Sequence, residues 1–264
     1  EMSASLVGSE MCIRDRGQGG TDAAKAAADM ILTDDNFATI VKAVRQGRII
    51  YSNIRKTVHF LLSSNIGEIV VIFAAYLLGM PTPLLPIQLL FVNLITDSLP
   101  AMALGTEKAE KDIMLQKPLK THKSMFSGGL WADILLEGLL IGGLSLVSFT
   151  LGMRLFDASS QPLIGRTMAF VTLNISELVH AFNMRGHMPM YKIGYFSNMR
   201  LTLTFALCMA IQWLVVTIPA AAEIFSLVPL SGSAWIIALA LSAVPFIMIE
   251  SSKIFDFYKK AHKA

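Results

Sequence analysis

Six apolar stretches follow one another along the chain after residue 56, and Pro, Gly or charged residues separate them. Each is close to the roughly 20 residues that an α-helix needs to cross a bilayer. Backbone polar groups cannot stay unpaired in lipid, so stretches of this kind are expected to be helices. The six predicted spans are residues 57–79, 84–104, 129–152, 164–184, 201–220 and 234–256.

The residues before these spans have a different pattern. Residues 17–36 start with glycines, continue with an Ala-rich helical run and end in an acidic turn, which predicts a short α/β piece. In residues 37–56 apolar side chains recur every three or four positions among basic ones, which is typical of an amphipathic helix in water. Residues 1–16 are interpreted as an unrelated or artefactual leader. We therefore expect an all-α polytopic membrane protein in which six transmembrane helices (57–256) follow this α/β remnant and precede a tail at 257–264.

The composition agrees with a membrane protein, since 54% of the residues are hydrophobic and 16% are charged. Soluble domains have about 45–50% and about 25%, and a disordered chain is poorer still in apolar residues. The net charge of +3 gives no basis for binding nucleic acid, so the expected partner is the lipid bilayer. Cys12 and Cys208 are far apart in sequence and predict neither a disulfide framework nor a zinc site.

Lysine and arginine are unevenly distributed between the loops. Twelve of them lie in the second and fourth loops and after the last span, whereas only Arg154 and Arg166 lie in the alternate loops. Because cytoplasmic loops carry the excess of basic residues, both chain ends are expected to be cytoplasmic. The loop between the first two spans is short, so these two helices are expected to form an antiparallel hairpin.

The first two spans carry polar residues in their middle. In the first span, Asn65 and Glu68 are three positions apart and therefore share a helix face. A second polar face lies in the next span and consists of Asn93, Thr96 and Asp97. The two helices are neighbours, and a carboxylate at membrane depth rarely faces lipid, so the two faces are expected to meet.

Two further residues are expected to loosen these helices. Pro100 lacks a backbone donor and clashes with the carbonyl four positions earlier, and Gly67 lies beside Glu68. The resulting site would offer carboxylate, amide, hydroxyl and freed carbonyl oxygens, which are hard ligands that suit Ca²⁺ better than a soft metal. The alternative is that the Asn and Thr side chains only form hydrogen bonds between helices.

Other titratable residues lie in the later spans. Glu177 and His180, three positions apart in the fourth span, are interpreted as either a proton relay or a packing contact. Asp133 and Glu137 fall near the cytoplasmic end of the third span, where water is expected to solvate them.

Several of these segments resemble one known family. SSNIGE in the first span and LPIQLLFVNLITDSLPAMALG in the second resemble P-type cation-transporting ATPases of the calcium-pump (type IIA) subclass. The following EKAEKDIMLQKP resembles the cytoplasmic loop after the sixth membrane helix of that family, and residues 17–36 resemble the end of its phosphorylation domain. The resemblance covers residues 17–264 and implies that residues 37–56 are a cytoplasmic stalk and that the six spans are membrane helices five to ten.

This resemblance also implies a function. It makes Asn65, Glu68, Asn93, Thr96 and Asp97 ligands of a transported Ca²⁺ ion that exchanges against H⁺. The phosphorylated Asp-Lys-Thr-Gly-Thr motif of the family and its fourth membrane helix do not occur in the sequence. We therefore expect the C-terminal transport domain of a pump in a bacterial-type plasma membrane. This domain would not hydrolyse ATP itself and would depend on the N-terminal portion of the same pump, with its ATP and Mg²⁺.

Arg185 bears on the number of transported ions. Two-site pumps of this family carry a further carboxylate on the eighth membrane helix, whereas the end of the fourth span here reads HAFNMRG. A fixed cation at Arg185 would repel a second Ca²⁺, so one ion per cycle is expected. The rival interpretations are a pump of the same family for Mn²⁺ or a monovalent cation, and a non-enzymatic transporter module of six helices.

Overall fold

The computed structural model describes residues 23, 26, 31, 36–110, 113–115, 126, 129–157 and 162–261. The predicted leader and nearly all of the predicted α/β remnant lie outside the described residues, as do the last three residues of the predicted tail. The described part of the chain therefore consists mainly of the predicted stalk (37–56) and the six predicted spans.

Two compact units make up the chain. The first comprises residues 1–51 and 109–117, and in it Arg48 Nη1 donates a hydrogen bond of 2.9 Å to the carbonyl oxygen of Ile113. The second comprises residues 52–108 and 118–264. Helix α3 (Phe37–Leu77) begins in the first unit and continues in the second, so the predicted stalk and the first span are one helix.

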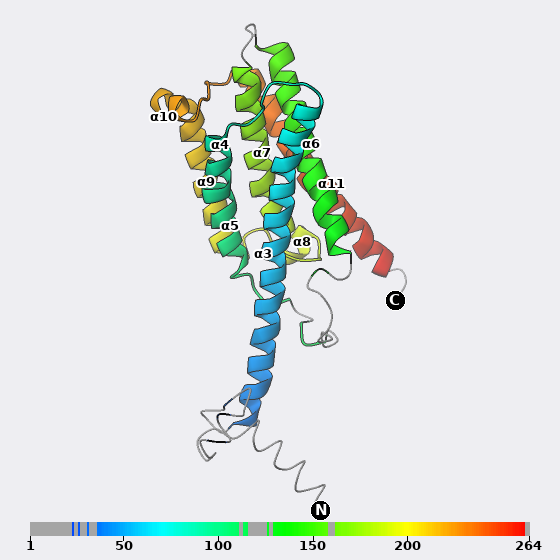
Figure 1. The fold of residues 1–264 in the computed structure, drawn as a ribbon. Coiled ribbons are helices and arrows are strands. Elements are labelled where there is room, and N and C mark those ends of the chain that lie inside the picture. The colour runs from blue at the N-terminus through cyan, green and yellow to red at the C-terminus, as the bar shows by residue number, and fades with distance from the viewer. Residues whose placement is uncertain are drawn as a thin grey trace, which may run out of the picture. The chain divides into compact units, whose positions relative to one another are not determined.

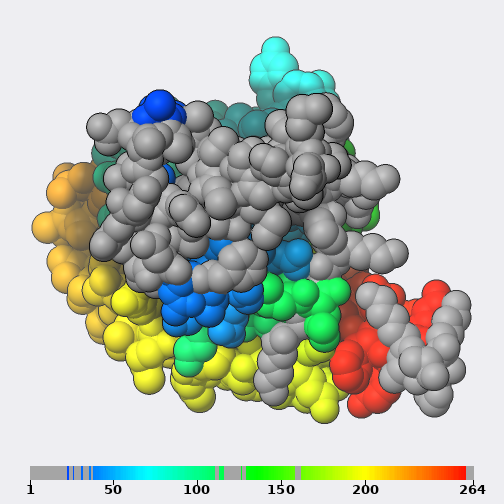
Figure 2. Space-filling view, turned by 90° about the horizontal axis from the view of Figure 1, so that it is seen from below, coloured from blue at the N-terminus to red at the C-terminus, as the bar shows by residue number. Residues whose placement is uncertain are grey.

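The second unit is helical throughout its described part, where no strand occurs (Figure 1). After α3, the helices are α4 (Pro86–Phe91), η1 (Val92–Asp97), α5 (Ser98–Leu104), α6 (Leu130–Leu155), α7 (Leu163–Asn183), α8 (Met190–Ile193), α9 (Met199–Thr217), α10 (Pro219–Ile224) and α11 (Gly232–Ala261). The π-helix η1 joins α4 and α5 into one run. Seen from below, α8 and the last turns of α11, coloured yellow and red, both lie on the visible face (Figure 2).

Five of the described helical runs are long and apolar enough to cross a membrane, namely α3, the run α4–η1–α5, α6, α9 and α11. They coincide with five of the six predicted spans. The remaining prediction, residues 164–184, coincides with α7 in position, but α7 does not reach the same apolarity. Polar residues recur along α7, and most of its side chains are buried, because α6, α9 and α11 pack around it (Figure 1). A helix that faces protein does not need the apolar surface of a helix that faces lipid.

Glycines allow α3 and α6 to approach closely. A Cβ atom on Gly138 would lie 2.6 Å from Ile66 Cγ2 and 2.8 Å from the carbonyl oxygen of Ser63, and one on Gly142 would lie 2.5 Å from the carbonyl oxygen of Gly67. Small residues at such positions are typical of helix contacts in membranes. The expectation that Gly67 loosens its helix is wrong, since α3 continues through it and packs against α6 there.

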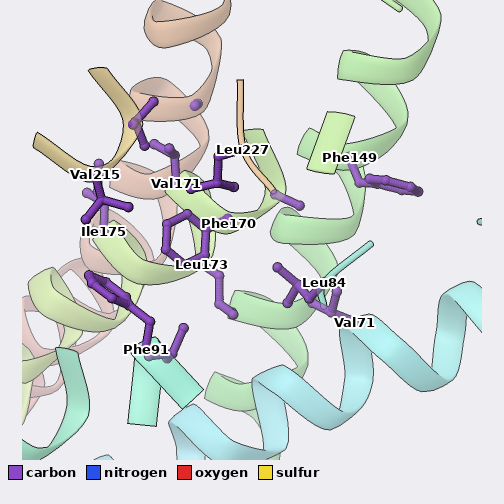
Figure 3. Packing of buried hydrophobic residues seen from close by; sticks show 14 of the residues in the cluster. Val71, Leu84, Phe91, Phe149, Phe170, Val171, Leu173, Ile175, Val215 and Leu227 are labelled. Atoms are coloured by element: carbon purple, nitrogen blue, oxygen red, sulfur yellow. The ribbon is translucent and has the colours of Figure 1, made fainter. Parts of the chain in front are cut away.

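An apolar core fixes the run α4–η1–α5 against α7 (Figure 3). The rings of Phe91 in α4 and Phe170 in α7 have centroids 5.5 Å apart, and Phe225 contacts Phe91 edge-on at 5.3 Å. Aromatic pairs in such geometry add about 0.5–1.5 kcal/mol to what their burial contributes. Since Phe91 directly precedes η1, this packing fixes the start of the polar segment.

Candidate intramembrane cation site

The segment that carries Asn93, Thr96 and Asp97 is the π-helix η1. Pro100 explains the irregularity, because it has no N–H for the carbonyl of Thr96 and its ring would clash with that carbonyl in a regular α-helix. The Ser98 hydroxyl donates a hydrogen bond of 2.8 Å to the carbonyl of Asn93. The expected loosening therefore takes the form of a wider turn, which is a frequent feature of functional sites.

Glu68 of α3 and Asn93 of η1 are in direct contact. Asn93 Nδ2 lies 2.9 Å from Glu68 Oε1 and 3.0 Å from Oε2, and it also donates to the carbonyl oxygen of Leu89 at 3.0 Å. Glu68 is 7% exposed, so its carboxylate lies within the protein. A half-turn of the Asn93 amide would place its oxygen, instead of its nitrogen, toward a cation bound to Glu68.

Asp97 of η1 is a second buried acid of this site. It is 1% exposed, and although Ser64 of α3 faces it, neither carboxylate oxygen is in hydrogen-bond geometry with a donor among the described residues. Asp97 also lies within electrostatic range of Glu68. A buried charge without partners is costly, so an ionised Asp97 would need a compensating positive charge nearby.

Thr96 faces α7. Its hydroxyl lies 2.8 Å from Asn174 Oδ1 and 2.9 Å from the carbonyl oxygen of Val92. Asn174 Nδ2 in turn donates a hydrogen bond of 2.7 Å to the carbonyl oxygen of Phe170. Sequence reasoning missed Asn174. The signal in the sequence was its spacing, since Asn174 lies three positions before Glu177 and therefore shares a helix face with it. In the structure both side chains are fully buried on α7.

Asn65 is held within its own helix. Its Nδ2 donates a hydrogen bond of 2.7 Å to the carbonyl oxygen of Leu61, and its side chain is half-buried. No hydrogen bond joins it to the other four predicted ligands in the part of the chain that the structure describes.

Glu177 of α7 completes a group of three acids, which we call the carboxylate cluster (Glu68, Asp97 and Glu177). Glu177 is fully buried, both of its carboxylate oxygens are without a hydrogen-bond partner among the described residues, and it lies within electrostatic range of the other two acids. Three helical segments, α3, η1 and α7, therefore bring carboxylate, amide and hydroxyl oxygens into one region, although no three of the described His, Cys, Asp and Glu side chains lie close enough together to hold a metal ion as they stand. This donor set suits a hard divalent cation.

Arg185 lies in a different group of contacts. Its Nε and Nη2 lie 2.9 and 3.1 Å from the two carboxylate oxygens of Glu107, and its Nη1 donates to the carbonyl oxygens of Gly194 and Tyr195 at 2.9 and 3.1 Å. Asn198, which caps α9, donates to Glu107 Oε2 at 2.8 Å. A paired guanidinium does not act as a free cation toward the ion site, so the reason given for a single Ca²⁺ does not hold.

The charges of this pair stabilise each other. Burial raises the pKa of the Glu107 carboxyl, but the hydrogen bonds from Arg185 and Asn198 and the positive charge of Arg185 outweigh burial, so the net pKa lies below its ordinary value. Glu107 is therefore ionised at neutral pH and neutralises Arg185.

Glu137 is not solvated by water, which corrects the expectation from sequence. Its side chain is 13% exposed, and its Oε2 lies 2.6 Å from His59 Nε2 of α3 and 3.5 Å from His180 Nε2 of α7. Ser63 Oγ also lies 3.0 Å from His180 Nε2. Glu177 and His180, the two residues assigned to a relay or to packing, therefore have different neighbours, one in the carboxylate cluster and the other beside Glu137.

Comparison with known proteins places these features in a family. The family described as cation transporting ATPase, C-terminus, matches residues 81–255. Calcium-transporting ATPase 1 of Bacillus cereus is 43% identical over 249 residues, and the calcium-transporting ATPase of Bacillus subtilis is 38% identical over 234 residues. The endoplasmic reticulum calcium ATPase srcA of Aspergillus fumigatus is 37% identical over 260 residues.

These matches cover 88–89% of this chain but only 26–28% of the relatives, so the chain spans about a quarter of their length. The family match begins before α4 and ends within α11, and it therefore includes η1 and α7. The chain belongs to the cation-transporting P-type ATPases and corresponds to the C-terminal part of their calcium-transporting members.

Proposed function

We propose that the second unit is the transport domain of an ATP-driven calcium pump and that the carboxylate cluster, with Asn93, binds the transported Ca²⁺. The observation that carries this proposal is Asp97, which is buried with both oxygens unpaired while Glu68 and Glu177 lie within electrostatic range. A divalent cation would compensate these acids, and their hard oxygens suit calcium. The names of the curated relatives, which specify calcium, support the choice of ion.

Proton exchange follows from the same arrangement. When the cation leaves, three buried carboxylates would face one another without compensation, which is unfavourable at low dielectric. Protons can take the place of the cation, because a carboxyl group that is protonated carries no charge. We therefore propose that Ca²⁺ moves against H⁺.

The proposal includes six membrane crossings, with α7 as the fourth. The exposed basic residues Lys192, Arg200 and Lys259 belong to the region of α8, the start of α9 and the end of α11. By the positive-inside rule, we assign this face to the cytoplasm, and the bacterial relatives favour a bacterial-type plasma membrane. ATP hydrolysis with Mg²⁺ is assigned to the rest of a longer protein, since the chain spans about a quarter of its relatives.

The number of ions depends on Glu177. If Glu177 only binds protons, one Ca²⁺ per chain is expected, as the sequence predicts. If it is a ligand, its carboxylate supplies part of the negative charge that a second divalent ion would need, although three carboxylates (−3) do not compensate two such ions (+4) in full. Equilibrium binding of ⁴⁵Ca²⁺ to the wild type and to Glu177→Gln distinguishes the two cases.

The function is tested by ATP-dependent ⁴⁵Ca²⁺ uptake into proteoliposomes that contain the full-length pump. Asp97→Asn should weaken Ca²⁺ binding by about tenfold to a hundredfold, since a lost bond to a charged group costs about 1.5–3 kcal/mol. Asp133→Asn is the matched control, because Asp133 is exposed. Unchanged Ca²⁺ affinity in Asp97→Asn, or uptake of Mn²⁺ or a monovalent cation in place of Ca²⁺, contradicts the proposal.

A further inference from the structure

A row of titratable side chains crosses three helices and begins three positions along α7 from Glu177, with no hydrogen bond to the carboxylate cluster among the described residues. Glu177 and His180 are three positions apart on α7, and His180 Nε2 lies 3.5 Å from Glu137 Oε2 on α6. The same carboxylate oxygen lies 2.6 Å from His59 Nε2 on α3, although neither of these two atoms is in hydrogen-bond geometry among the described residues. The exposed fraction of the side chain rises along this row, from 0% at His180 to 14% at His59. The row therefore connects a fully buried position with one that reaches the surface.

We propose that His180, Glu137 and His59 form a proton relay between the carboxylate cluster and the end of the bundle from which α3 enters the membrane, an inference that rests on the proposed exchange of Ca²⁺ for H⁺. Under the proposed orientation this end is cytoplasmic. The relay would carry the protons that leave the cluster when Ca²⁺ enters it.

Contacts of His180 define which of its nitrogens accepts a proton. The Ser63 hydroxyl has a single hydrogen, and the carbonyl oxygen of Phe60 at 2.9 Å is an acceptor for it. Ser63 Oγ then accepts from His180 Nε2–H at 3.0 Å, so Nε2 carries the proton. His180 Nδ1 is left buried as an acceptor without a partner among the described residues. The imidazole can thus take up a proton at one nitrogen and release another from the other nitrogen.

The transfer conserves protons at each step. His180 gains a proton on Nδ1, its Nε2–H turns from Ser63 Oγ toward Glu137 Oε2, which lies 3.5 Å away, and the Nε2 proton passes to that oxygen, so that Glu137 becomes neutral. Glu137 passes that proton to His59 Nε2 and is ionised again, and His59 releases its Nδ1 proton to water. Rotation of each imidazole ring restores the starting tautomer, so one proton has entered the row and one has left it.

Lys253 of α11 is the other charged group beside the relay. Its Nζ donates to the carbonyl oxygen of Gly186 at 2.7 Å and contacts that of Asn183, and it lies within electrostatic range of Glu137 and His180. These carbonyl contacts fix its position. A fixed positive charge at this place opposes the accumulation of protons on the relay and so favours their onward passage.

A purely structural contact between α3, α6 and α7 would give different results from a relay. Thr172 and Ser148 provide the matched control, because their hydroxyls join α7 and α6 at 2.7 Å in a buried hydrogen bond that contains no titratable group. Thr172→Val removes a contact between the same two helices without removing a proton carrier.

The test is stopped-flow measurement of Ca²⁺-triggered H⁺ release from the full-length pump in proteoliposomes, with a pH-sensitive dye on the cytoplasmic side. Glu137→Gln and His180→Gln should slow H⁺ release by at least about a hundredfold, the lower end of the range for a lost proton-transfer group. Equilibrium ⁴⁵Ca²⁺ binding should stay within about twofold, and Thr172→Val should release H⁺ at the wild-type rate. Added imidazole should restore the rate in His180→Gly but not in Glu137→Gln.

Three results would overturn the relay. The first is wild-type H⁺ release in Glu137→Gln and His180→Gln, and the second is a slowing in Thr172→Val equal to theirs. The third is a wild-type pump that takes up Ca²⁺ without moving H⁺, which overturns the proposed exchange as well and is thereby distinguishable from the first two. If the Glu137 and His180 variants do not assemble, His59→Gln at the more exposed end of the row serves instead. A slowed H⁺ release in this variant supports the relay, and a wild-type rate overturns it.

Discussion

Glu107, which follows α5, and Arg185, which follows α7, meet in a two-point ion pair that is almost completely buried. The pair connects the segment that follows the run α4–η1–α5 with the loop between α7 and α9. Arg185→Met would leave the Glu107 carboxylate buried without its cation, and we expect a loss of about 3–5 kcal/mol in stability. Thermal unfolding of the detergent-solubilised protein measures this loss. The double variant Glu107→Gln, Arg185→Met should recover a large part of it, and equal losses in the single and double variants would contradict the argument.

The same pair predicts a pH dependence of stability. The folded-state pKa of Glu107 lies below its ordinary value of 4.5, so the stabilisation is complete above that pH and is lost as the pH falls through the folded pKa. The melting temperature of the wild type should therefore exceed that of Glu107→Gln at about pH 6, and the difference should shrink below about pH 4.5. A difference that stays constant down to about pH 3 would mean that Glu107 contributes in another way.

Pro100 predicts how η1 responds to mutation. Pro100→Ala restores a backbone donor and removes the clash with Thr96, so η1 should narrow into a regular α-helix and rotate Asn93 relative to Asp97. Equilibrium ⁴⁵Ca²⁺ binding should weaken by about tenfold, which corresponds to about 1.4 kcal/mol. Pro245→Ala in α11 is the control, because Pro245 also lies inside a helix but not in α3, η1 or α7, the segments that carry the carboxylate cluster. Equal effects of the two substitutions would refute the role of the π-turn.

Two adjacent glycines of α6 should differ sharply in their tolerance of a methyl group. A Cβ atom on Gly142 would lie 2.5 Å from the carbonyl oxygen of Gly67 and 2.8 Å from Val70 Cβ, whereas nothing lies within 4 Å of one on Gly143. Gly142→Ala should destabilise the protein by about 1–3 kcal/mol, the usual cost of overpacking. Gly143→Ala should have little effect, and comparable melting temperatures for the two variants would contradict the close packing of α3 and α6.

The sequence predicted five membrane-spanning helices with bounds close to those of the structure. Long apolar runs and the Pro, Gly and charged residues between them determine such helices locally. It also indicated that Glu68 and Asn93 face each other, since a short loop joins their helices. The predicted fourth span shows the limit of this reasoning. The lower apolarity of α7 accompanies its burial, but which helices surround it depends on contacts between segments that the local sequence does not specify.

The site could be predicted only as far as local spacing determines it. Glu177 and Asn174 come close to η1 through the packing of α7, which connects residues about 80 positions apart in sequence. The pairing of Arg185 with Glu107 and that of Glu137 with His59 likewise depend on contacts between distant segments. From sequence, Glu137 was expected to be solvated and Arg185 to act as an unpaired cation. The three-dimensional arrangement shows that both side chains have partners on other segments.

Burial of α7 has a consequence for how the protein is made. The polar side chains of α7 find their partners on other helices, such as Thr96 for Asn174, so a nascent α7 on its own would meet lipid with these groups unsatisfied. Gly152 near the end of α6 and Gly165 near the start of α7 pack so closely that a Cβ on the first would lie 2.5 Å from Cα of the second. The two segments should therefore leave the translocon together as a hairpin, and the order of synthesis, α6 before α7, suits that joint insertion.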